Sequence, residues 1–146
     1  MKNLLLYLLL VPVTFGVTTT CPIMLDDEID PEEVSTVLDQ KIEFCCGSCV
    51  KAFDANVAYY IKAIPELANR FTDAQKKQLK VCCVKLLEQR YCPVYPDRII
   101  NPNSPTVEYM GKTIYLWSSS AVRRWNKKPD EYYYQAVERG HLQKNN

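Results

Sequence analysis

The chain has 146 residues, a formal net charge of +1 and a charged fraction of 24%. That length is enough for one ordinary domain or two very small ones, and the balanced charge argues against a nucleic acid or a membrane surface as partner. Ten Tyr, two Trp and four Phe supply apolar bulk for a core, which argues against disorder over most of the chain.

Residues 1–17 have the pattern of a secretion signal. Lys2 supplies a positive start, and the apolar run from Leu4 to Val13 is too short to span a bilayer comfortably. We therefore expect an exported protein, periplasmic or secreted, from which this segment is removed. Two alternatives stay open: an uncleaved N-terminal membrane anchor, and lipidation of Cys21, which closely follows the apolar run.

A first structural unit is expected at residues 19–64. The pair Cys21-Pro22 opens it and precedes a polar loop, and a strand pair is predicted around Ser35–Leu38 and Lys41–Cys45. Gly47-Ser48 then suits the entry and cap of a helix. Apolar residues recur at steps of three or four, which predicts one amphipathic helix through Val50, Phe53, Val57, Ile61 and Ile64.

A linker is expected at residues 65–89, and a helix is predicted within and just beyond it, over Thr72–Tyr91. One face of this helix is apolar and comprises Leu79, Cys82, Cys83, Leu86 and Leu87. Cys82 and Cys83 are therefore interpreted as core thiols. Pairing of one of them with Cys92, or its ligation of a metal ion, stays open as an alternative.

A second unit is expected at residues 90–137, because the chain repeats itself there. Cys92-Pro93-Val94 repeats Cys21-Pro22-Ile23, and Trp125 matches Phe53. A strand pair with an intervening turn is predicted at Thr106–Tyr109, Met110-Gly111-Lys112 and Thr113–Trp117. The predicted fold class is therefore α+β, with two β-hairpin-plus-helix modules joined by an amphipathic helix.

Residues 138–146 are predicted to form a polar tail. This tail contains the only histidine, His141, for which disorder is a simpler interpretation than metal ligation. No Ser–His–Asp order is present, and the four scattered glycines form no phosphate-binding loop. We therefore expect a protein that is not an enzyme.

Cysteines gather where the first predicted strand pair gives way to its helix. Cys45, Cys46 and Cys49 lie close together in the sequence, and Cys21 approaches from the opening Cys-Pro pair. Metal binding needs thiolates aimed at one centre about 2.3 Å away, and a helix N-terminus favours the thiolate form. The pattern predicts a soft-ion site for Zn²⁺ or Cu⁺ that uses Cys21, Cys45 and Cys49, with Cys46 as fourth ligand or neighbouring thiol.

The combination of Cys-Pro, Phe-Cys-Cys-x-x-Cys-x-x-x-Phe and a tyrosine-containing helix resembles the YHS/TRASH family. The residues that carry the match are Cys21, Pro22, Phe44, Cys45, Cys46, Cys49, Phe53 and Tyr60. This resemblance implies small treble-clef-like modules that bind heavy metals and occur in metal sensors, chaperones and transporters. It also implies Cys21, Cys45 and Cys49 as ligands, a role in metal trafficking or homeostasis, and a metal transporter or chaperone as partner.

The second unit resembles the same family only in its frame. Its hairpin segment, Gly111–Tyr115, matches, but Trp117, Ser118 and Ala121 stand where the first unit has its clustered cysteines. Cys92 is left alone, and one thiol cannot build a stable soft-metal site. We expect this degenerate copy to be structural and to bind no metal, with an aromatic ligand pocket as the alternative.

The cysteines also allow interpretations without a metal. Cys21 can form a structural disulfide with the cluster, as small exported domains often do. Cys46 and Cys49 can form a thiol–disulfide redox pair, because a Cys-x-x-Cys at a helix start lowers the pKa of its first thiol. The aromatic second unit can serve as a non-catalytic protein-interaction module in a chain stabilised by disulfides.

Overall fold

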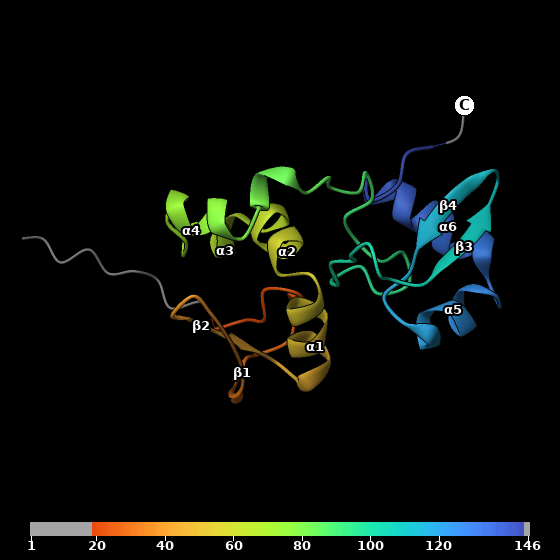
Figure 1. The fold of residues 1–146 in the computed structure, drawn as a ribbon. Coiled ribbons are helices and arrows are strands. Elements are labelled where there is room, and N and C mark those ends of the chain that lie inside the picture. The colour runs from red at the N-terminus through yellow and green to blue at the C-terminus, as the bar shows by residue number, and fades with distance from the viewer. Residues whose placement is uncertain (1–18, 145–146) are drawn as a thin grey trace, which may run out of the picture.

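Two β-hairpins, each followed by helices, organise the chain in the computed structural model, which describes residues 19–144 (Figure 1). The hairpins are antiparallel pairs: β1 (Asp30–Val37) with β2 (Gln40–Phe44), and β3 (Thr106–Tyr109) with β4 (Lys112–Tyr115). The α+β class expected from the sequence is confirmed. The predicted secretion signal lies outside the described residues.

Both hairpins close through two-residue turns with positive φ at both positions. The angles are 45° and 67° at Leu38 and Asp39, and 49° and 74° at Met110 and Gly111. Turns of this kind follow the right-handed twist of the flanking strands, so they close tight hairpins. The strand predicted from Ser35 begins five residues earlier, at Asp30, with a register shift before Val34.

The single helix predicted after the first hairpin is two helices, α1 (Gly47–Ala55) and α2 (Val57–Ala63). Asn56 separates them with a non-helical backbone (φ −143°, ψ 38°), and its side chain donates a hydrogen bond to the Ala52 carbonyl at 3.3 Å. Asparagine competes with the backbone for such bonds and so favours helix ends. The predicted cap also differs, because Cys46 is the N-cap of α1 and makes no side-chain capping bond.

The long linker helix predicted over Thr72–Tyr91 is wrong. After the short α3 (Pro65–Ala68), the structure has α4 (Asp73–Gln78), a 3-10 turn η1 (Val81–Cys83) and a connection without regular structure. A Thr72–Gln75 capping box starts α4 as expected, but Lys80 has φ 55° and turns the chain off the helix axis. The residues that follow, valines and cysteines, are weak helix formers.

Cys82 and Cys83 are exposed, so their interpretation as core thiols is also wrong. Their Sγ atoms lie 3.5 Å apart. The Lys62 ammonium from α2 donates hydrogen bonds to the Cys82 carbonyl at 3.4 Å and to the Val84 carbonyl at 2.6 Å. This contact satisfies carbonyls that have no helical partner and fixes the segment outside the core.

The C-terminal segment is more ordered than the predicted polar tail. In the second half, α5 (Ser119–Trp125) and α6 (Pro129–Glu138) follow the hairpin. Gly140, at φ 71°, ends α6 in a Schellman motif, with the His141 N–H donating to the Ala136 carbonyl at 2.8 Å. The chain then folds back, and the His141 ring packs against Tyr91 with centroids 4.5 Å apart.

The two Cys-Pro segments fold alike. We call residues 20–28 the first knuckle and residues 91–99 the second knuckle, because each closes on itself through a β-bridge between its end residues. The Cys21 N–H donates to the Asp27 carbonyl at 2.8 Å, and the Cys92 N–H donates to the Arg98 carbonyl at 3.0 Å. These bonds occupy matching positions, so the two halves share one local backbone design.

The knuckles also join the two halves, whose hairpins lie on opposite sides of the molecule (Figure 1). The Ile99 N–H donates to the Ile23 carbonyl at 3.0 Å, and the Leu25 N–H donates to the Asp97 carbonyl at 2.9 Å. Each half has its own apolar core. The first core includes Phe44, Phe53 and Tyr60, and the second includes Leu116, Trp125 and Tyr133.

Buried hydrogen bonds of the Tyr60 hydroxyl cross between the halves and can be tested, one of them donated to the Ile99 carbonyl at 3.5 Å. The Asn101 amide donates to the Tyr60 hydroxyl at 2.8 Å, and both residues are buried. We expect Tyr60→Phe to lower the free energy of unfolding by about 1–3 kcal/mol, because the amide loses its acceptor without access to water. Urea unfolding measures this, with Tyr134→Phe, at a half-exposed position, as the control. Equal stability of the two variants would contradict this role of the bond.

Candidate metal centre

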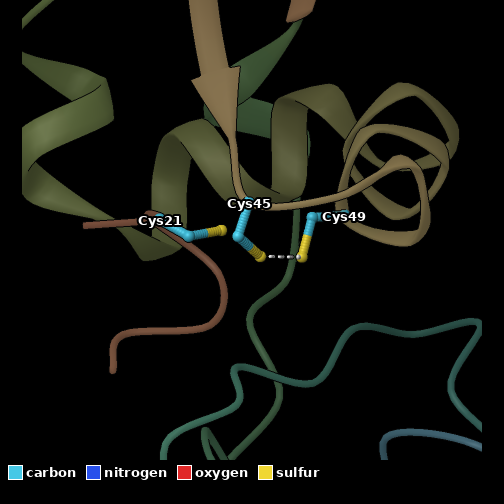
Figure 2. A group of neighbouring side chains, drawn as sticks. All are labelled: Cys21, Cys45 and Cys49. Carbon is cyan, nitrogen blue, oxygen red and sulfur yellow. Dashed lines mark hydrogen bonds between the residues drawn. The ribbon is translucent and has the colours of Figure 1, made fainter. Parts of the chain in front are cut away.

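Three cysteine side chains from three separate parts of the first half meet at one point. The Sγ atoms of Cys21, Cys45 and Cys49 all lie within 4.8 Å of one another. Figure 2 shows the three side chains directed into the same space, one from the first knuckle, one from the end of β2 and one from the first turns of α1. The predicted convergence of these three thiols is therefore present in the structure.

Aromatic packing fixes the end of β2 against α1 and so brings Cys45 to Cys49. The rings of Phe44 and Phe53 are fully buried with centroids 5.2 Å apart. The backbone between them turns sharply at Cys46, whose carbonyl accepts the Cys49 N–H at 3.0 Å. Since Phe44 directly precedes Cys45 and Phe53 lies one turn after Cys49, their contact positions both thiols.

The spacing of the Cys45 and Cys49 sulfurs suits a tetrahedral ion. With bonds of about 2.3 Å, such an ion places its sulfur ligands about 3.8 Å apart. The Sγ atoms of Cys45 and Cys49 are 3.7 Å apart. Cys21 and Cys49 are fully buried and Cys45 is half-buried, so the three thiols are largely shielded from solvent.

The three thiols of the group differ in how readily they lose a proton. A hydrogen bond from Cys49, together with the Met24 N–H, lowers the pKa of the Cys21 thiol to about 5 despite burial. Sharing that bond with Cys21 raises the pKa of Cys49, and burial raises the pKa of Cys45 to about 12. These opposite shifts favour the thiolate form of Cys21 over that of Cys45 or Cys49.

Cys46 is at the edge of this arrangement rather than within it. Its Sγ lies 3.8 Å from that of Cys45, but it is outside the group of three whose ligand atoms are mutually close. Burial raises the pKa of Cys46, yet backbone N–H groups of Cys49 and Ser48 outweigh this effect and lower it below its ordinary value. Of the two roles predicted for Cys46, the structure favours that of a neighbouring thiol.

Met24 is the residue at this site that the sequence analysis missed. Its N–H donates to the Cys21 Sγ at 3.4 Å, and the Cys45 thiol donates to its Sδ at 3.7 Å. The side chain is buried, with 5% of its surface exposed. Its position three residues after Cys21 was the only available signal, since a methionine in an apolar segment is normally interpreted as core.

The second knuckle holds its cysteine in the same way but without other thiols nearby. Cys92 is fully buried, and its Sγ accepts the Trp117 N–H at 3.4 Å. Burial raises the pKa of Cys92. Within residues 19–144, only the Cys21, Cys45 and Cys49 group brings three or more potential metal ligands together. The exposed pair Cys82 and Cys83 does not reach that group.

Comparison with known proteins gives no further assignment, because no family model, no curated protein and no solved structure matches the chain. The resemblance to the YHS/TRASH family therefore stays a prediction. Among the helices of the described segment, none has both the length and the apolar character needed to cross a membrane.

The charge state of the thiols predicts how ion binding depends on pH. Cys45 and Cys49, with raised pKa values, are protonated at neutral pH and must release their protons to an ion, whereas Cys21 is already ionised. We expect the affinity to rise with pH, its logarithm gaining about two units per pH unit near neutrality. Titration with Zn²⁺ at several pH values measures the slope. An affinity that does not change with pH would mean that all three thiols are already ionised.

Proposed function

We propose that this protein is an exported metal-binding protein that holds a soft ion, Zn²⁺ or Cu⁺, through Cys21, Cys45 and Cys49. The observation that carries the proposal is that three thiols from separate elements lie within 4.8 Å of one another in a buried site. Sulfur ligands select such ions over Mg²⁺ or Ca²⁺. Export is inferred from the pattern of residues 1–17 alone.

We propose that the two halves are tandem YHS/TRASH-like modules with a degenerate second copy, because they resemble each other in local structure. Their knuckles have matching backbone hydrogen bonds, and each half continues with a hairpin and helices. Trp117 donates its N–H to Cys92 from the position that corresponds to Cys45 in the first half. The second half thus keeps the frame, while aromatic residues such as Trp125 fill its core.

The half-buried Cys45 favours an ion that can be exchanged. An ion bound there can be approached by an incoming thiol from the side of Cys45, whereas Cys21 and Cys49 are closed to solvent. This asymmetry suits transfer to or from a metal transporter or a metal chaperone, which we propose as the partner class.

The metal content of paired variants tests the proposal. We expect the reduced wild-type protein to bind a single ion per chain. The double variant Cys45→Ser, Cys49→Ser should bind none. The matched control is Cys82→Ser, Cys83→Ser, which removes the same number of thiols from the exposed pair and should keep the ion. Elemental analysis after gel filtration measures the content. Equal metal in both double variants would refute the assignment.

A thiol–disulfide redox protein is the second candidate, favoured by the lowered pKa of Cys46 at the N-cap of α1. We expect Cys46→Ser to retain the bound ion, because its thiol lies outside the group of three ligands. Metal analysis of the wild type and of Cys46→Ser checks this, and an insulin reduction assay on both proteins measures their redox activity. Disulfide exchange by the wild type that Cys46→Ser abolishes would favour the redox candidate instead.

A further inference from the structure

The sulfur of Met24 stands in the same relation to Cys45 as another thiol would. The distance from Met24 Sδ to Cys45 Sγ is 3.7 Å, equal to the distance from Cys45 Sγ to Cys49 Sγ. Two sulfurs at that separation can both lie about 2.3 Å from one ion, with an angle near the tetrahedral value. The spacing therefore allows Met24 and Cys45 to bind one ion together.

The backbone holds Met24 at the centre independently of its side chain. Its N–H donates to Cys21 Sγ at 3.4 Å, and Met24 forms a β-bridge with Arg98 of the second knuckle. The side chain is 5% exposed, so its thioether is directed to the interior beside the thiols and not to solvent. Met24 thus ties the coordinating group to the contact between the two halves.

We propose that Met24 Sδ is the fourth ligand of the centre and that the centre selects Cu⁺ over Zn²⁺. This proposal rests on the proposed function. Protein ligands of Zn²⁺ are thiolates, imidazoles and carboxylates, and none of the last two joins the group. A neutral thioether binds the soft Cu⁺ ion, and a set of cysteine and methionine sulfurs is characteristic of Cu⁺ sites. Cys46 Sγ lies 3.8 Å from Cys45 Sγ but is outside the group of three mutually close ligand atoms, so Zn²⁺ would find only three thiolates in the centre.

X-ray absorption of selenomethionine-labelled protein tests this ligand without altering the fold. The full chain is loaded with Cu⁺ under reducing conditions, and the fine structure of the X-ray absorption is recorded at the copper edge. We expect one selenium neighbour of copper beside the sulfur shell, and loss of that neighbour in Met24→Leu. Copper bound by sulfur with no selenium neighbour would overturn the assignment of Met24 while leaving the proposed function intact. Absence of any bound copper or zinc would overturn the proposed function itself.

Ion competition then tests the selectivity. Met24→Leu conserves side-chain volume and is expected to fold, and Met110→Leu, in the turn between β3 and β4, is the matched control. We expect Met24→Leu to lower the Cu⁺ affinity at least about 10-fold, since loss of a direct ligand costs no less than loss of an outer contact. Its Zn²⁺ affinity should be unchanged, and Met110→Leu should change neither. Equal Cu⁺ affinity of the two variants would overturn the proposal.

Discussion

The contact between the Phe44 and Phe53 rings is the interaction on which the rest of the site depends. These buried rings, 5.2 Å apart, fix the end of β2 against α1 and leave the intervening turn to carry the cysteines. Cys45 and Cys49 are thereby placed with their Sγ atoms 3.7 Å apart. The packing of the hydrophobic core thus contributes to the geometry of the sulfur ligands.

Comparison of the two knuckles distinguishes the backbone hydrogen bonds that fold a knuckle from the sulfur atoms that can bind an ion. Cys92 Sγ accepts the Trp117 N–H at 3.4 Å from outside its knuckle, and within residues 19–144 it belongs to no cluster of potential metal ligands. The knuckle therefore folds without a coordinating group, stabilised by its own hydrogen bonds and by apolar burial. In the first half, a knuckle with the same backbone hydrogen bonds places Cys21 beside the thiols of Cys45 and Cys49. An ion can bind these three sulfurs in place of the hydrogen bonds between them.

Local sequence patterns predicted much of this fold. The predictions were wrong where contacts between distant parts of the chain determine the structure. The hairpins and the convergence of Cys21, Cys45 and Cys49 follow from alternation, turn residues and spacing within one short segment. The linker helix failed because Lys80 adopts positive φ and Lys62, from α2, binds the carbonyls that follow. Met24 was missed because its apolar side chain is interpreted as core until the knuckle shows its direction. The position of His141 likewise involves a contact with the distant Tyr91.

An anomalous difference map from crystals of the ion-loaded protein tests the central claim most directly. It locates the bound metal relative to every sulfur at once, independently of affinity or of the behaviour of variants. We expect one peak within about 2.3 Å of the Sγ atoms of Cys21, Cys45 and Cys49. A peak beside the exposed Cys82 and Cys83 pair instead, or no ordered metal in the first half, would contradict it.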